Sequence, residues 1–527
     1  METAGQKENK TIVKAAGTVG FATLISRAFG YVRDMVIAFF FGAGWVTDAF
    51  FVAFRIPNML RRLVAEGSLT VSFIPVFTDY LSNKSKKEAL ELANIVFCLL
   101  SILLVFIVVV GIVFSPIIVR LIAPGFGDYP AQFALTVFLN RLMFPYILFV
   151  SLVALAMGIL NSFKHFYAPA MSPILLNISI ILAAYLLRDL FTEPIIALAI
   201  GVLVGGVLQL AMQFPYLIKF GFRPRLDFNI KHPGIRRILM LMLPTTLGAA
   251  VYQINVFIGT LLASFLPKGS VSYLYYSDRI VEMPLGVFGI ALGTAILPSL
   301  SRQVAQGRID EMQKTLSFSL NTLFFLTIPA MVGLILLREP IVAVLFGRGE
   351  FSPLAVTKTA DALLCYSLGL WAFASVRIVS SGFFALSDAQ TPMKAAIIAM
   401  VFNVVFSLIL MIPLQHVGIA LATSIASAIN VLFLGVVLWR RIGAFLDKAF
   451  FLSQGKILFS SLVMVAVLLL FEWLAPFALR TGEANRIGWL VAAFVLGGGA
   501  YFTASFLSGA NEVRYLLSRL TGNRIKR

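Results

Sequence analysis

The chain has 527 residues, of which 60% are hydrophobic and only 13% are charged, and its formal net charge is +18. This composition excludes an ordinary soluble enzyme and is typical of a polytopic membrane protein. The basic residues are spread through short stretches between apolar runs, which indicates topology signals and argues against a nucleic-acid-binding surface. The two cysteines, Cys98 and Cys365, lie far apart in apolar stretches, so we expect neither a disulfide nor a metal site.

Apolar runs of about 20 residues predict an all-α protein with about fourteen transmembrane helices and no soluble domain. The polar start of the chain, residues 1–14, does not resemble a cleaved signal peptide. With that start in the cytoplasm, the loops on the same side hold most of the Lys and Arg residues, which predicts that both termini are cytoplasmic. The predicted helices begin near residues 14, 46, 92, 133, 168, 194, 238, 272, 315, 355, 394, 416, 456 and 487.

Three pairs of identical residues, which serve as landmarks, are each separated by 224 residues, and this indicates an internal duplication. Six predicted helices separate equivalent points, so the two halves run in the same direction through the membrane. Parallel repeats predict two six-helix lobes around a central cavity that can open to either face, followed by two additional helices. The expected boundaries are 1–230, 231–450 and 451–527. The landmarks are Arg55 and Arg279, Pro116 and Pro340, and Gly158 and Gly382.

Eight arginines interrupt or border the predicted membrane spans. A charged side chain at the centre of a transmembrane helix costs roughly 2.5 to 3.5 kcal/mol even on the lenient insertion scale. These arginines must therefore face water, a counter-charge or a ligand. They are Arg27, Arg33, Arg55, Arg61, Arg62, Arg141, Arg279 and Arg377.

The first predicted helix carries Ser26, Arg27, Arg33 and Asp34, whereas its repeat partner, at 243–259, carries no charge. Helical spacing predicts that Arg27 and Asp34 share a face and that Arg33 projects to one side. The alternative for this cluster is an internal Arg–Asp ion pair, in which the two charges neutralise each other and bind no ligand. Nearby arginines outnumber nearby carboxylates, which favours a ligand.

Two further predicted spans carry charge. In the second, Arg62 and Glu66 are four residues apart and are expected to pair, which leaves Arg61 unpaired. The alternative for these arginines is anchoring at the cytoplasmic surface. The eighth span places Asp278, Arg279 and Glu282 in an otherwise apolar segment, where the alternative is a self-neutralised cluster.

A surplus of arginine in a water-accessible cleft is suited to phosphate. The planar guanidinium group donates two parallel hydrogen bonds and keeps its charge at any physiological pH. The sequence therefore predicts a ligand that is both phosphorylated and amphiphilic. It contains neither a Walker glycine loop nor an HExxH motif, so we expect no catalytic residues and no cofactor.

Several motifs resemble the MurJ (MviN) lipid II flippase family, which belongs to the multidrug/oligosaccharidyl-lipid/polysaccharide exporter superfamily. The resemblance implies that the protein moves undecaprenyl-diphosphate-linked disaccharide-pentapeptide, lipid II, across the bacterial cytoplasmic (inner) membrane for peptidoglycan synthesis, by alternating access. The implied partners are lipid II and membrane lipids, and the protein is expected to be a monomer. The motifs are SRAFGYVRD, GAGWVTDAFFVAFRIPNMLRRLVAEGSLTVSFIPVF, YYSDRIVEMPLGVFGIALGTAILPSLS and the TPMK loop.

The resemblance also implies a set of substrate-binding residues. Arg27, Arg33 and Arg279 are expected to grip the diphosphate, and Asp34 and Glu282 are expected to orient those guanidinium groups. The last two predicted helices resemble the extra helices of the family, which implies that they form a groove for the polyprenyl tail. The remaining members of the set are gate or sugar-facing contacts and their neighbours, namely Asp48, Asn58, Arg61, Ser26 and Asp278.

Some members of this family use a sodium ion between the seventh, eleventh and twelfth spans. The corresponding region here offers Gly259, Asn403, Ser407 and Thr423 but no carboxylate, so we expect no sodium site. Protonation of Asp34 or the membrane potential is then the candidate energy source.

Three alternative functions stay open at this point. The first is a MATE-like antiporter of cationic drugs, which would need an acidic cleft. The second is a flippase for another polyprenyl-diphosphate glycan, which the same arginines would permit. The third is a non-transporting scaffold, which has no reason to keep charge inside the membrane.

Overall fold

The computed structural model describes residues 4–61, 69–480, 482–510 and 512–513. Within these ranges the chain is helical and contains no β-strand, which confirms the all-α prediction. The chain divides into two compact units, Met1–Val271 and Ser272–Arg527. Each unit is described by itself.

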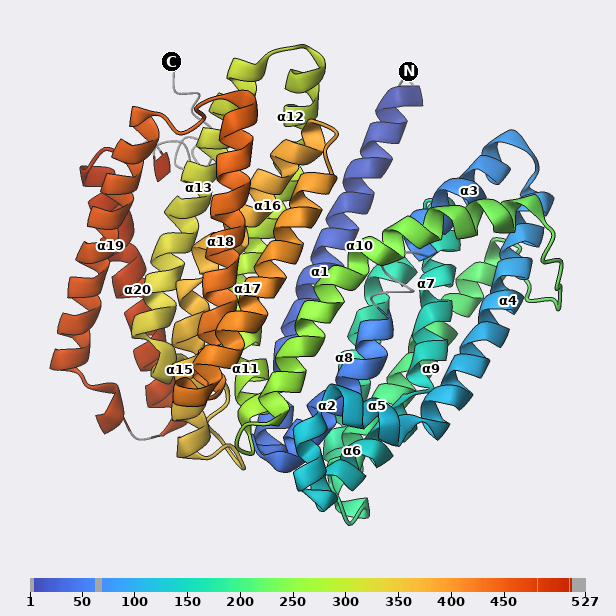
Figure 1. Cartoon of the computed structure of the whole chain (residues 1–527), viewed down its shortest axis with the longest axis horizontal. Coiled ribbons are helices and arrows are strands. Elements are labelled where there is room, and N and C mark those ends of the chain that lie inside the picture. Colours follow the sequence, from blue (N-terminus) through green and yellow to red (C-terminus); the bar gives the residue numbers. More distant parts are fainter. Residues whose placement is uncertain (1–3, 62–68, 481, 511, 514–527) are drawn as a thin grey trace. The chain divides into compact units, whose positions relative to one another are not determined.

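The first unit is a bundle of ten α-helices in the described part of the chain (Figure 1). The start of α4 shows how local sequence defines a helix end, because Ser85 Oγ accepts a hydrogen bond from the Glu88 amide and donates one to the Glu88 carboxylate. The helices are α1 (Ala4–Phe41), α2 (Trp45–Leu60), α3 (Thr70–Asn83), α4 (Lys86–Val113), α5 (Ser115–Ile122), α6 (Pro130–Met143), α7 (Tyr146–Ser162), α8 (Tyr167–Leu186), α9 (Ile196–Lys219) and α10 (Pro233–Ser264).

Close contact between α8 and α9 depends on glycine. A Cβ atom placed on Gly201 would lie 2.8 Å from the Ala183 Cβ and 2.9 Å from the Ile180 Cα. Membrane helices associate through close packing of this kind, since lipid gives little hydrophobic drive for helix association. The contact matters for function because α8 also packs against α1, the helix with the buried charges.

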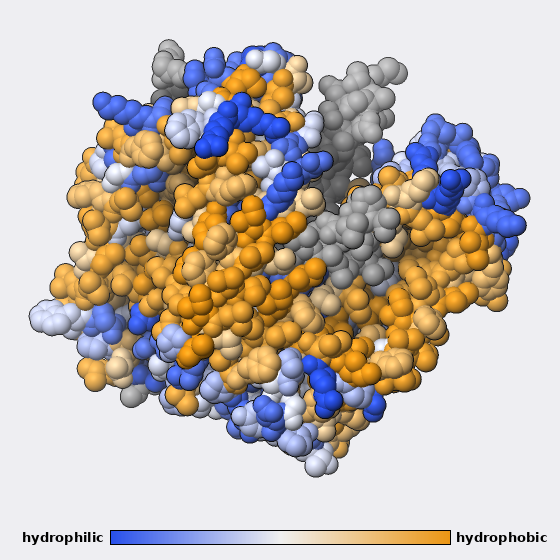
Figure 2. All heavy atoms as spheres, viewed as in Figure 1, coloured by the Kyte–Doolittle hydropathy of each residue, from blue (hydrophilic) through white to orange (hydrophobic). Residues whose placement is uncertain are grey.

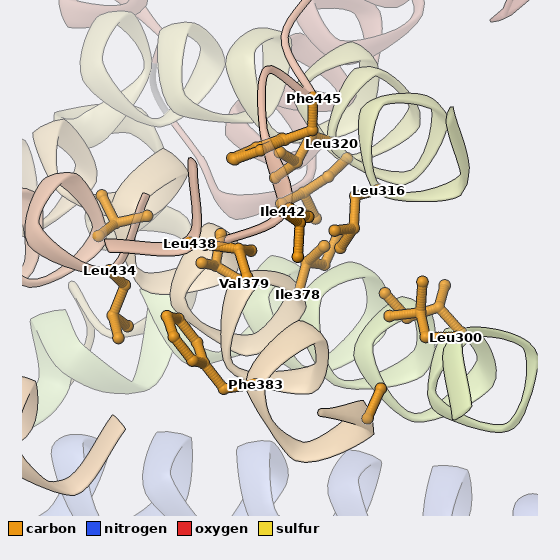
Figure 3. Close-up of a cluster of buried hydrophobic side chains, with 14 of the residues drawn as sticks. Leu300, Leu316, Leu320, Ile378, Val379, Phe383, Leu434, Leu438, Ile442 and Phe445 are labelled. Carbon is orange, nitrogen blue, oxygen red and sulfur yellow. The ribbon is translucent and has the colours of Figure 1, made fainter. Parts of the chain in front are cut away.

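The second unit is built around a core of leucine, isoleucine and phenylalanine side chains from α13, α16 and α18 (Figure 3). Leu316, Ile378, Phe383 and Leu438 are fully buried there. The helices are α11 (Ser270–Pro284), a π-helical turn η4 (Leu285–Ile290), α12 (Ala291–Ala305), α13 (Ile309–Leu336), α14 (Arg338–Leu345), α15 (Pro353–Leu368), α16 (Leu370–Ala385), α17 (Gln390–Leu414), α18 (His416–Ile442), α19 (Lys448–Leu474) and α20 (Glu483–Leu507).

Eleven helical stretches among the described residues are long and apolar enough to cross a membrane. Figure 2 shows apolar side chains over much of the visible surface, with hydrophilic residues concentrated toward the helix ends. The predicted count of fourteen is not confirmed. Of the predicted spans outside the eleven, the first includes Arg27, Arg33 and Asp34, and the second is divided between α2 and α3. In the third, α10, the described stretch Gln253–Ser264 is apolar but shorter than a membrane span.

Several helix starts repeat along the chain at an offset of 223 residues, whereas α7 and α16, which contain Gly158 and Gly382, start 224 residues apart. Helices α4 and α13 both have 28 residues, and equivalent loops before α8 and α17 place Lys164 and Ser387 at the same φ of 59°. This offset is one residue less than the 224 of the sequence landmarks. Pro116 is accordingly the second residue of α5 and Pro340 the third of α14, so these prolines are not equivalent. The helix starts that define the offset are Lys86 and Ile309, Pro130 and Pro353, and Tyr167 and Gln390.

Candidate functional site

Arg33 and Asp34 form a buried ion pair on α1. The Nε and Nη2 atoms of Arg33 lie 3.0 Å and 2.7 Å from Asp34 Oδ1, and its Nη1 atom donates to Asn177 Oδ1 at 3.1 Å. Arg33 is 7% exposed and Asp34 is 1% exposed. A buried charge pair is tolerated when further hydrogen bonds satisfy its polar atoms, and Asn177 supplies one of them.

Asn177 is a member of this cluster that the sequence analysis missed. It lies on α8, and its Nδ2 atom donates to the backbone carbonyl of Ser26 at 3.2 Å. Asn177 therefore joins α8 to two turns of α1. A polar amide inside the apolar run ILLNISI was the available signal, because polar side chains within membrane spans are commonly functional.

Arg27 is exposed and has no hydrogen-bond or ion-pair partner among the described residues. Spacing places Asp34 on the face of Arg27 and directs Arg33 to one side, and the ion pair that the structure shows on this helix joins Arg33 to Asp34. The long arginine side chain reaches the adjacent carboxylate, so the shared helical face does not decide the partner. Arg27 is left as an accessible cation.

Asp48 is buried in the first turn of α2, and its Oδ2 atom accepts a hydrogen bond of 2.6 Å from the Gly269 amide. Arg55 lies about two helical turns after Asp48 on α2, and it donates a hydrogen bond to Thr260 Oγ1 on α10. Two polar contacts thus attach α2 to the end of α10 and the connection that follows it. Both contacts lie within the first unit.

Arg61 is not unpaired, contrary to the expectation from the sequence. Its Nε atom donates to Asn58 Oδ1 at 3.0 Å, one turn earlier on the same helix. The expected partners Arg62 and Glu66 lie outside the described residues. Asn58 and Arg61 are therefore neighbours, as their shared motif suggested.

In the second unit, Arg279 and Glu282 form an ion pair one turn apart on α11, with 2.8 Å between Arg279 Nη1 and Glu282 Oε2. Their side chains are 31% and 41% exposed, so this pair is accessible where the Arg33–Asp34 pair is buried. Asp278 is exposed beside them. The Arg279 guanidinium group, which carries five N–H donors, is therefore partly exposed to solvent.

Three residues of the possible sodium region gather between α17 and α18. Asn403 Oδ1 lies 3.4 Å from both Ser407 Oγ and Thr423 Oγ1, while Gly259 belongs to the first unit. Among the described residues, no group of three or more His, Cys, Asp and Glu side chains is placed to hold a metal ion. The absence of a sodium site stays a prediction.

The apolar helices, the repeated helix pattern and the charges inside the membrane spans define a polytopic membrane transporter. The fold is that of an inward-facing MATE-family multidrug resistance transporter of the MOP superfamily, with a TM-score of 0.68, 16% identity, and coverage of 82% of this chain and 99% of that one. A solved structure of lipid II flippase MurJ in an inward closed conformation gives a TM-score of 0.79 at 30% identity, covering 93% of this chain and 98% of that chain.

Sequence comparison leads to the family. The model described as lipid II flippase MurJ matches residues 37–484. The probable lipid II flippase MurJ of Buchnera aphidicola is 39% identical over 457 residues, covering 87% of this chain and 89% of the relative. The lipid II flippase MurJ of Burkholderia cenocepacia is 36% identical over 509 residues, covering 94% and 98%. This chain therefore belongs to the MurJ lipid II flippase family, a family of transporters and not of enzymes, and it is a multi-pass bacterial inner-membrane protein.

Proposed function

We propose that this protein moves lipid II from the inner to the outer leaflet of the cytoplasmic membrane by alternating access. Membership of the flippase family over most of the chain is the observation that carries the proposal. The placement of arginine supports it, because a diphosphate needs cationic donors inside the membrane.

In this proposal Arg27, Arg33 and Arg279 hold the diphosphate. Arg27 is exposed without a partner among the described residues, and Arg279 keeps an accessible guanidinium, which suits both to direct contact. Arg33 is buried and paired with Asp34. It therefore either leaves Asp34 to contact the diphosphate or attracts the diphosphate at a distance through its charge. Glu282 orients Arg279 in the same way that Asp34 orients Arg33.

We assign the remaining candidate residues to gating and to contacts with the sugars. Asp48 is bonded to the Gly269 amide, so breaking that contact would free the connection after α10. Asn58 and Arg61 form a hydrogen-bonded pair that offers an amide and a guanidinium to a glycan. Ser26 contributes its backbone carbonyl to Asn177, and Asp278 is exposed beside Arg279.

We further propose two lobes, 1–230 and 231–450, with 451–527 as an addition that holds the polyprenyl tail. In the repeat, α10 is the counterpart of α1 and so begins the second lobe, although in this conformation it packs against α3 and α5. We propose cytoplasmic termini, a monomer, and coupling to the membrane potential or to protonation of Asp34.

A MATE-like drug antiporter is the main alternative, and the likeness to a MATE transporter at 16% identity concerns the fold alone. A pathway for cationic drugs would be disfavoured by the accessible cations Arg27 and Arg279. A flippase for another polyprenyl-diphosphate glycan would use the same arginines, so substrate competition must separate it from the proposal.

The test is support of growth in a bacterium depleted of its own lipid II flippase. Arg27→Ala and Arg279→Ala should each abolish growth while the protein still accumulates in the membrane. Arg141→Ala is the matched control, because Arg141 is exposed and donates to the Ile112 carbonyl outside the proposed site. Normal growth of the Arg27 and Arg279 variants would contradict the proposed clamp.

A further inference from the structure

The segment 222–231, which connects α9 to α10, has an unusual position. It contains no helix or strand, and Figure 1 shows it as a green loop beside α4. Phe222 at its start is fully buried and packs edge-on against Phe97 of α4, with 5.9 Å between the ring centroids. The segment is thus attached to a membrane helix and does not extend freely into solvent.

The backbone of the segment is bonded to polar groups on α4. The Arg225 amide donates to Asn94 Oδ1 at 3.0 Å, Cys98 Sγ donates to the Arg225 carbonyl at 2.9 Å, and the Asp227 amide contacts Cys98 Sγ at 3.4 Å. Asn94 and Cys98 are one turn apart on the same helical face. These bonds satisfy the polar backbone where the segment is in contact with the helix.

The same bonds define the depth of the segment in the bilayer. Helix α4 is a candidate span of 28 residues, and about 20 residues suffice to cross the hydrocarbon core. Counted back from Val113, the edge of the core lies near Asn94. Cys98 lies about 6 Å further along the axis, at about 1.5 Å per residue. The segment therefore lies at the boundary between lipid headgroups and acyl chains.

The side chains of the segment separate into two kinds. Leu226, Phe228 and Ile230 are 85%, 51% and 68% exposed. They are the apolar residues of the stretch 226–230 and alternate there with Asp227 and Asn229. Asp227, the only acidic residue in the segment, accepts a hydrogen bond from the Asn229 amide.

Exposed basic residues flank these apolar residues along the chain. The neighbouring start of α10 adds further basic residues, one of which, Arg237, pairs with Asp79. An apolar edge flanked by cations at this depth matches the chemistry of an anionic phospholipid, whose acyl chains and phosphate group lie at adjacent levels. The exposed basic residues are Arg223, Arg225, Lys231, Arg236 and Arg237.

We propose that segment 222–231 is an interfacial anchor that inserts Leu226, Phe228 and Ile230 among acyl chains and binds the phosphate groups of anionic lipids with Arg223, Arg225 and Lys231. A bilayer is a better match than a protein partner, because exposed apolar residues of α4 such as Ile102 and Leu103 already face lipid at greater depth on the same helix. The anchor is independent of the transported substrate and goes beyond the proposed function.

The depth of the segment can be measured with a nitroxide label. Both native cysteines are buried, so Phe228→Cys can be labelled selectively in the full-length protein in nanodiscs. Lys87→Cys, exposed at the start of α4, is the aqueous control. The label at 228 should collide more with oxygen than with a nickel chelate, and the label at 87 should show the reverse. Equal nickel accessibility at the two positions would overturn the proposed insertion.

Headgroup preference is tested by native mass spectrometry of the intact protein with phosphatidylglycerol, phosphatidylcholine or soluble glycerol phosphate. Wild type should retain phosphatidylglycerol over phosphatidylcholine. The triple variant Arg223→Gln/Arg225→Gln/Lys231→Gln should retain phosphatidylglycerol at least about tenfold more weakly than wild type, because each basic residue near an anionic surface contributes to binding. An unchanged unfolding temperature will show that the variant is folded.

A control variant has the same change in net charge elsewhere. Arg302, Lys314 and Lys394 are exposed in the second unit, and their triple change to Gln should leave retention intact. An equal loss in both variants would show a general charge effect and overturn the assignment to segment 222–231. Displacement of phosphatidylglycerol by soluble glycerol phosphate would show a free phosphate site and would equally contradict the anchor.

Discussion

The buried cluster of Arg33, Asp34 and Asn177 gives a quantitative prediction. The change Asn177→Leu removes an acceptor from a buried guanidinium and a donor from the Ser26 carbonyl. A hydrogen bond to a charged group contributes about 1.5 to 3 kcal/mol, so we expect a loss of about that size in the free energy of unfolding. The change Asp34→Leu is more severe, because it leaves the charge of Arg33 buried without a counter-charge and should cost about 3 to 5 kcal/mol.

The double change Arg33→Leu/Asp34→Leu separates pairing from simple burial. It removes both charges, and a buried ion pair is commonly replaced by apolar residues with little loss. The double variant should therefore be more stable than Asp34→Leu alone, although we expect it to be inactive. Equilibrium unfolding in detergent, supported by unfolding temperatures, measures these differences.

Asn161→Leu is the control for the cluster, because the Asn161 Oδ1 atom is buried without a hydrogen-bond partner in the described structure. This change should cost less than about 1 kcal/mol, since no hydrogen bond to that atom is lost. The reasoning would be refuted if Asn177→Leu cost no more than Asn161→Leu, or if the double variant were less stable than Asp34→Leu.

Three other predictions can be tested on the same protein. Arg279→Lys should fail to support growth in flippase-depleted cells, because an ammonium group does not reproduce the bidentate guanidinium; full growth would show that charge alone suffices. Replacing external sodium by potassium should leave flipping unchanged in proteoliposomes, and loss of flipping would establish a sodium requirement. Hydrogen bonds from Thr391, together with Arg441, lower the pKa of Asp388 to about 2. The stability it contributes should therefore be full above its unfolded pKa of about 4 and lost as the pH falls toward 2. Asp388→Asn should flatten the unfolding temperature across that window, and an unchanged slope would argue against this contribution.

Much of the fold follows from hydrophobic periodicity. Runs of apolar residues predicted the long helices, and helix α18 begins at residue 416 as expected. The register of the duplication could not be read in the same way. Pro116 and Pro340 look equivalent in the sequence, but equivalence depends on the turn at which each helix begins, and α5 and α14 begin one residue out of step with those prolines.

The candidate site was less predictable, because its contacts depend on rotamers and on distant segments. Arg33 pairs with Asp34 because its side chain is long enough to reach an adjacent position. Asn177 joins the pair from 144 residues away. Cys98 was predicted only to form neither a disulfide nor a metal site, and its Sγ atom bonds to the Arg225 carbonyl, 127 residues later in the chain. No local pattern specifies such pairings, which follow from helix packing.

The central claim is that accessible arginines of this chain hold the diphosphate of lipid II. Native mass spectrometry of the purified protein tests it directly, with lipid II, other prenyl diphosphates and a cationic drug in competition. We predict that wild type retains lipid II, and that Arg27→Ala and Arg279→Ala each weaken retention by about 10- to 100-fold, as loss of a hydrogen bond to a charged group implies. Undiminished retention by both variants, or displacement of lipid II by the drug, would contradict the claim.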